Sequence, residues 1–151
     1  MTPAGGPSRS RLMPGGLLAV LLAAAVAAGC RPPEPPRADS VARYEEGNTQ
    51  LAAENVAGAR EAFAAAVGLG GLRPDVHATA KLRLAYCEAC LGDTEAAGQL
   101  LDSLEEGSPD LGEVYAMRAF VCRKAGDAAK ADAAWAEAQR WNPAVRMPRE
   151  P

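Results

Sequence analysis

The sequence has very few of the side chains on which catalytic and metal sites depend. Histidine occurs once, at position 77, and aromatic residues make up 5% of the 151-residue chain. A catalytic triad or a metal site needs several partners at defined spacing, and nothing near His77 supplies them. A lone histidine at the start of a helix is most often a solvated surface residue. We therefore expect no catalytic centre, metal or cofactor, and a protein that is not an enzyme.

An excess of positive charge is also missing. The formal net charge is −3, and residues 1–29 contain two arginines and no acid, so the charge from Cys30 onward is −5. Nucleic acids are bound through clustered Lys and Arg side chains. The composition therefore argues against a nucleic-acid partner, and an acidic surface would be repelled mildly by an anionic leaflet.

Strand signals are scarce between Ser40 and Asn142, whereas Ala, Leu, Glu and Arg are abundant. Glycines and prolines gather between segments of helix length. The sequence predicts an all-α domain with six helices, at about residues 40–53, 56–67, 75–91, 94–106, 111–125 and 128–141. In the last of these helices one buried face is expected, made by Ala131, Trp135, Ala138 and Trp141.

One motif occurs three times. Its last copy begins with Gly126-Asp127 and continues with Ala131, Trp135, Ala138 and Pro143. The copy before it has the same internal spacing and holds Gly92, Asp93, Ala97, Leu101, Leu104 and Pro109. The first copy holds Glu54, Asn55, Ala59, Phe63 and Ala66 at the corresponding positions.

This pattern resembles the tetratricopeptide repeat (TPR) family, whose period is about 34 residues. The resemblance implies three helix-turn-helix repeats over residues 40–145, which form a short right-handed α-solenoid, and a tail at 146–151. The first helices match less well. Tyr115, Gly47 and Leu84 fit the family pattern, whereas other positions depart from it, namely Arg43, Glu46, Lys81, Glu88, Arg118 and Cys122.

In TPR proteins the first helices of successive repeats line a concave groove. By resemblance, the groove here would carry Tyr44, Asn48, Leu51, Leu82, Tyr86, Phe120, Arg123 and Lys124, with Cys90 and Glu113 on the same stripes. Aromatic and leucine side chains suit an extended or helical peptide, although each could instead pack against a neighbouring helix. Some family members clamp a terminal carboxylate with Lys, Asn and Arg. Only Asn48 matches that set, so such a clamp is not expected.

Cysteines form the remaining chemical motif, Cys87-Glu88-Ala89-Cys90, with Cys122 one repeat further on. A redox pair of this spacing usually follows a strand, and a zinc site needs a second ligand pair. Burial as small apolar residues between first helices is therefore the favoured interpretation. In an oxidising compartment a disulfide among the three stays open, as does a redox role of Cys87 and Cys90.

Residues 1–29 have the arginines and the apolar run, Leu17–Gly29, of an export signal. Ala27-Ala28-Gly29-Cys30 resembles the lipobox of bacterial lipoproteins, in which the chain would be cleaved before Cys30 and this cysteine lipidated. An ordinary secretory signal is the alternative. An uncleaved anchor is a weaker one, because the run is short for a span of about 20 residues. Acyl chains on Cys30 would hold the protein at a membrane.

Residues 30–39 contain four prolines and are expected to form an extended linker. A Pro-rich ligand for adaptor domains is the other interpretation. Aspartate after the lipidated cysteine is the usual signal for inner-membrane retention, and Arg31 stands there instead. The resemblance thus implies the outer membrane of the bacterial envelope, with the domain facing the periplasm.

Together these features predict a non-catalytic scaffold that binds a protein or peptide in the groove. Similar lipoproteins assist assembly of secretins, pili and outer-membrane barrels. The alternatives are a soluble exported enzyme or redox protein, and an accessory part of a larger complex. After Pro143 there is no room for a capping helix, so a second copy or a partner is expected to cover the last repeat.

Overall fold

Six helices make up the computed structural model, which describes residues 37–108 and 110–150. They are α1 (Arg37–Ala52), α2 (Val56–Leu69), α3 (Pro74–Cys90), α4 (Thr94–Glu105), α5 (Leu111–Lys124) and α6 (Ala128–Trp141). No strand occurs in these two ranges. The predicted all-α class is confirmed for this part of the chain, and all six expected helices are present.

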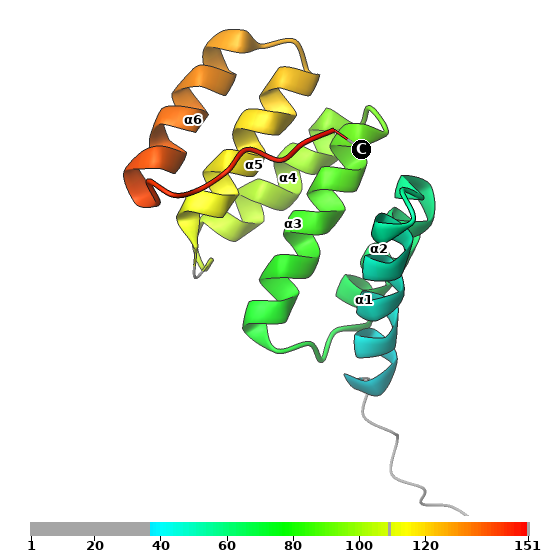
Figure 1. The fold of residues 1–151 in the computed structure, drawn as a ribbon. Coiled ribbons are helices and arrows are strands. Elements are labelled where there is room, and N and C mark those ends of the chain that lie inside the picture. The colour runs from blue at the N-terminus through cyan, green and yellow to red at the C-terminus, as the bar shows by residue number, and fades with distance from the viewer. Residues whose placement is uncertain (1–36, 109, 151) are drawn as a thin grey trace, which may run out of the picture. The chain divides into compact units, whose positions relative to one another are not determined.

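The helices form three hairpins, α1 with α2, α3 with α4 and α5 with α6, each joined by a short turn (Figure 1). Helix α3 is central, because it packs against α2, α4 and α5. Two apolar clusters fill the space between the hairpins. One is built on Phe63 and Cys87, and the other on Leu101, Val114 and Phe120. Each hairpin thus buries its apolar surface against the next.

The turns inside the three hairpins have the same local structure. Glu54, Gly92 and Gly126 all have positive φ, of 58°, 94° and 78°. The amide that follows each of them donates to a carbonyl five residues earlier, at N···O distances of 2.9 Å. The same following residue (Asn55, Asp93 or Asp127) caps the next helix with its side-chain oxygen. The repeat found in the sequence is therefore a repeat of backbone geometry.

Glu54 is the one non-glycine residue with positive φ in the described ranges. A left-handed conformation costs an L-residue about 1–2 kcal/mol, and glycine avoids that cost. We expect Glu54→Gly to raise the free energy of unfolding by about 0.5–1 kcal/mol, measured by urea denaturation.

The control is Glu106→Gly, because Glu106 is also exposed but has an ordinary φ of −78°. There the same substitution should lower the free energy of unfolding by about 0.5–1 kcal/mol. A loss of stability in both variants would contradict the strain assigned to Glu54.

Close contact between the helices of the first hairpin depends on Gly47. A Cβ atom at this position would lie 2.6 Å from the ring of Phe63, which is fully buried. The corresponding positions of the other hairpins hold Ala85 and Ala119, also fully buried. A small residue on the first helix thus leaves room for a large one on the second.

Two details differ from the prediction. Helix α1 begins at Arg37, so the last three residues of the expected extended linker are helical; Asp39 in the first turn favours this start. Trp141 is 58% exposed and Trp135 is half-buried, although Ala131 and Ala138 are fully buried. Ala134, seven residues earlier and on nearly the same side of the helix, is buried, so Trp141 is exposed because it is the last residue of α6.

Candidate functional site

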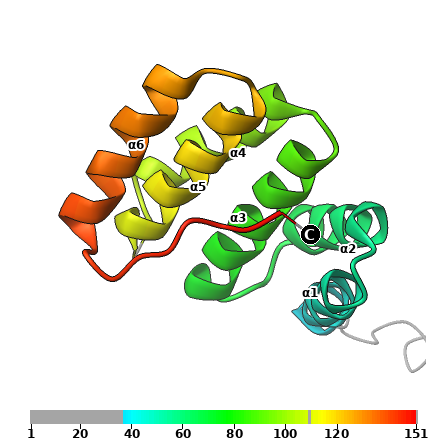
Figure 2. The same cartoon turned by 45° about the horizontal axis from the view of Figure 1, so that its top comes forward.

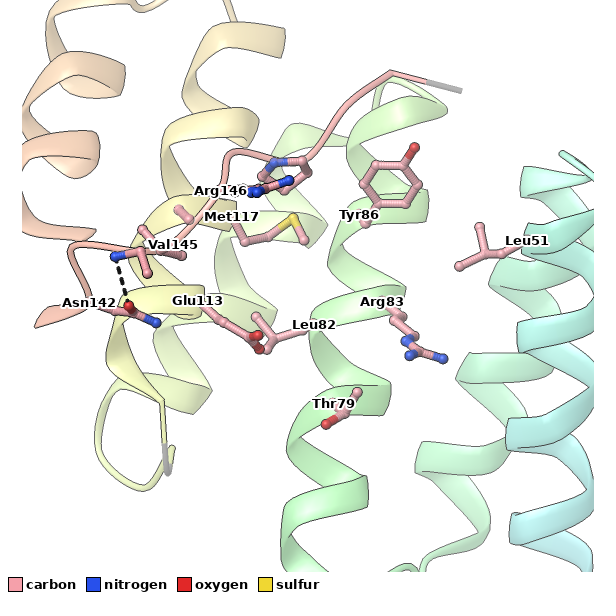
Figure 3. Close-up of a pocket in the computed structure, with 13 residues that line it drawn as sticks. Leu51, Thr79, Leu82, Arg83, Tyr86, Glu113, Met117, Asn142, Val145 and Arg146 are labelled. Atoms are coloured by element: carbon pink, nitrogen blue, oxygen red, sulfur yellow. Dashed lines mark hydrogen bonds between the residues drawn. The ribbon is translucent and has the colours of Figure 1, made fainter. Parts of the chain in front are cut away.

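A cavity of about 550 Å³ lies on the face formed by the first helices of the hairpins. Leu51 of α1 and Glu113 of α5 line it, together with Thr79, Leu82 and Arg83 of α3 (Figure 3). Its remaining wall is the chain that follows α6. The stretch Asn142–Glu150 is called the return segment below, and its residues Asn142, Ala144, Val145, Arg146 and Pro148 line the cavity.

The return segment runs back across α5 and toward α3 (Figure 2). It begins beside the N-terminal end of α5, where a Cβ atom on Gly112 would lie 2.5 Å from that of Asn142. Met147 packs against the cluster that contains Phe120. At the other end Lys124 of α5 forms an ion pair with Glu150, at 2.7 Å between Nζ and Oε1. The segment therefore contacts both ends of α5 while it crosses from α5 to the C-terminal part of α3.

Tyr86 and Phe120 form the aromatic floor beneath the second half of the return segment. Their rings stack with centroids 5.4 Å apart, and the Lys124 ammonium lies 5.7 Å from the Phe120 centroid. The Tyr86 hydroxyl donates to the carbonyl of Arg149 at 2.9 Å. These groups give the return segment an apolar surface, one hydrogen-bond donor and one cation.

Burial raises the pKa of Tyr86 to about 12, and the neighbouring Cys90 adds to this shift. The raised pKa adds stability that is fully present below about pH 10 and is lost as the pH rises toward 12. We expect wild type to lose more stability than Tyr86→Phe between pH 10 and 12, measured by urea denaturation at each pH. Parallel curves for the two proteins would show that the hydroxyl is solvated in the folded state.

Two of the three groove residues predicted on α1, Tyr44 and Asn48, make other contacts. Asn48 accepts a hydrogen bond from Arg83, and the Arg83 guanidinium lies 5.4 Å from the centroid of Tyr44. The Tyr44 ring also contacts Phe63, at 6.0 Å between centroids. Tyr44 and Asn48 thus join the first hairpin to the second and do not line the cavity.

The other predicted groove residues divide between two cavities. Leu51, Leu82 and Tyr86 line the larger one. Phe120, Arg123 and Lys124 line a neighbouring cavity of about 150 Å³ beneath the return segment. Their use by a partner stays a prediction.

Sequence reasoning missed Thr79, Arg83 and the return segment as parts of this site. One signal was present in the sequence. Val145 and Met147 alternate with Arg146, and alternation with period two is typical of an extended segment that has one apolar side. In the structure Val145 and Met147 are half-buried and Arg146 is exposed.

The described cysteines, Cys87, Cys90 and Cys122, are all free thiols in this structure. Burial raises the pKa of Cys87 to about 12, and it also raises that of Cys90. Glu88 lies between these two cysteines in the sequence. Both of its carboxylate oxygens accept a hydrogen bond from Arg60 Nε of α2, at N···O distances of 2.9 Å. The thiolate is the reactive form, so we expect Cys87 to react slowly at neutral pH.

We expect Cys87 to react with a thiol reagent at pH 8 at least about tenfold more slowly than Cys122, which is half-buried. The measurement compares two variants, each keeping one of these cysteines and having alanine at the other three cysteine positions. In urea both variants should react at the same rate, because neither thiol is then buried. Equal rates of the two variants in the folded state as well would contradict the burial of Cys87.

No group of three or more His, Cys, Asp or Glu side chains suited to a metal ion occurs in the part of the chain that the structure describes. His77 is half-buried, and burial together with Lys81 lowers its pKa. Both effects favour the neutral imidazole.

A scan against protein-family models, a search of the curated proteins and a search of the solved structures found no match. No helix within residues 37–108 and 110–150 has the length and apolar character to span a bilayer. The predicted signal sequence and the lipidation site Cys30 lie outside the described residues, as does most of the linker.

Proposed function

We propose that this protein is a non-catalytic scaffold whose three TPR hairpins form a short right-handed α-solenoid that binds a peptide or protein partner. The observation that carries the proposal is the cavity of about 550 Å³ on the first-helix face, with an aromatic pair beside it. Its lining combines apolar side chains with Arg83 and Glu113. Such a surface suits a peptide that makes both apolar and polar contacts.

The three equivalent turns support the TPR assignment, because they give the repeat in the sequence a structural basis. The redox alternative has less support. Its thiols would have to ionise at working pH, and burial raises the pKa of both Cys87 and Cys90.

Photo-crosslinking in the native host tests this function. A photoreactive amino acid replaces Thr79 or Glu113, which line the cavity, or Gln99, which is exposed on α4 outside it. We expect one and the same protein to be captured from positions 79 and 113 and not from position 99. Equal capture from all three positions, or different proteins from 79 and 113, would argue against a binding groove.

We further propose that the scaffold is lipid-anchored through Cys30 in a bacterial envelope, on the periplasmic side of the outer membrane, and assists assembly of an envelope complex such as a secretin, pilus or barrel machinery. The mass of the membrane-fraction protein should correspond to a chain that begins at Cys30 and carries acyl groups. Cys30→Ala should abolish both the added mass and the membrane association. An unmodified wild-type chain would indicate an ordinary export signal.

A second copy is the proposed cover for the last hairpin, because Trp141 is 58% exposed at the end of α6. Light scattering of wild type beside Trp141→Ser should show an oligomer that the substitution dissociates. A monomeric wild type would exclude this contact.

A further inference from the structure

We propose that the groove between α3 and α5 is a receptor for an extended peptide that carries an apolar residue, a proline directly after it and an acidic residue two positions beyond the proline, and that the return segment is an internal copy of this ligand. The inference rests on the proposed function and names the chemistry of its partner. The partner must therefore displace the return segment to bind.

The first argument is the length and direction of the return segment. After the turn at Pro143-Ala144, the six residues 145–150 span about 20 Å when extended, and a helix of the length of α5 is about 21 Å long. The segment starts beside Gly112, crosses toward the C-terminal part of α3, and pairs with Lys124 at the other end of α5 (Figure 2). An extended peptide of this size thus fits the groove without folding on itself.

The second argument is the nature of the contacts. Met147 supplies an apolar side chain to the core cluster, and half-buried Pro148 lines both cavities. The Tyr86 hydroxyl binds a main-chain carbonyl, which any sequence can provide. The Lys124 ammonium binds the Glu150 carboxylate. Backbone recognition with pockets for selected side chains is how extended peptides are bound.

The third argument is that the contacts are weak enough to exchange. Val145, Met147 and Pro148 are only half-buried, and the Glu150 side chain is 70% exposed. Exposed ion pairs of this kind contribute little free energy. The internal segment competes mainly because its tether gives it an effective concentration on the order of millimolar.

The test uses the full chain in detergent and a fluorescent peptide with the sequence of residues 142–150. One protein is wild type, and the other is the double variant Met147→Ser, Glu150→Gln, which weakens the internal contact and keeps the chain length. We expect the peptide to bind the double variant at least about tenfold more tightly than wild type, because the tethered competitor has been weakened.

Charge reversal identifies the site. In the double variant, Lys124→Glu should reduce peptide affinity about fivefold, and a peptide with lysine at the position of Glu150 should restore it. Arg140→Glu is the matched control, because it makes the same charge change on α6, away from the groove. This substitution should leave the peptide affinity unchanged.

Two results would overturn the inference. Equal affinity of wild type and the double variant would show that the return segment does not compete. No binding to the double variant, when its far-ultraviolet circular dichroism and urea unfolding match wild type, would show that the segment does not resemble the ligand. In either case crosslinking from Thr79 and Glu113 still decides whether the groove binds a partner.

A third outcome would show that the groove is filled by the return segment of a second copy of this chain. If wild type sediments as a dimer that Lys124→Glu dissociates, the return segment exchanges between two copies. The partner assignment would then be wrong, and the groove would be an interface between copies of this chain.

Discussion

Replacement of Leu101 by alanine is expected to lower the free energy of unfolding by about 2–5 kcal/mol. Leu101 is fully buried in α4 and belongs to the larger core cluster, beside Val114 and Phe120. Truncation removes apolar contact and leaves a cavity that the surrounding helices fill only in part. Urea denaturation followed by circular dichroism measures the loss.

Leu69→Ala is the matched control, because Leu69 is also helical but 45% exposed. Its cost should stay below about 1 kcal/mol. Leu101 lies in the middle hairpin, so its loss should weaken both neighbours and preserve a single unfolding transition. Similar costs for Leu69→Ala and Leu101→Ala would contradict the assigned core.

The second large effect concerns Phe63, whose replacement by alanine should cost about 3–5 kcal/mol. Phe63 is fully buried, and a Cβ atom on Gly47 would lie 2.6 Å from its ring. Gly47→Ala should therefore cost about 1–3 kcal/mol in wild type through overpacking. In the Phe63→Ala background the space is open, and alanine favours the helix by about 0.5–1 kcal/mol over glycine.

The sign of the Gly47 effect should thus reverse between the two backgrounds. A double-mutant cycle of the free energies of unfolding measures this coupling. Gly98→Ala is a control inside α4, where an added Cβ atom meets nothing within 4 Å, and it should stabilise both backgrounds equally. An unchanged cost of Gly47→Ala in the Phe63→Ala background would show that the ring is not what limits this position.

The helices could be predicted from the sequence because their limits depend on local chemistry. Gly92-Asp93 and Gly126-Asp127 each supply a left-handed residue and a helix cap within two positions, and the structure has both at these points. Glu54-Asn55 does the same with a less favourable first residue. Spacing alone thus identified the first copy of the turn, at Glu54-Asn55.

The cavity could be predicted only in part, because its shape depends on contacts between distant parts of the chain. Leu82 and Tyr86, which the sequence predicts on one stripe of α3, both line the larger cavity. The sequence pattern could not show that Arg83 would contact Asn48 and Tyr44 of α1, so that these two side chains do not line the cavity. The return segment was missed because a short stretch without helical periodicity gives no sign of where it packs.

Methyl NMR of methionine in the full chain tests most directly the claim that the groove is a peptide receptor filled by the chain itself. Met147 packs against the cluster that contains Phe120, so its methyl signal should be shifted by ring currents and should show an NOE to the Phe120 ring. Saturation with the unlabelled 142–150 peptide should move the Met147 signal to the position of a solvated methionine, while Met117 on α5 stays in a folded environment. A Met147 signal at the solvated position before any peptide is added would contradict the account.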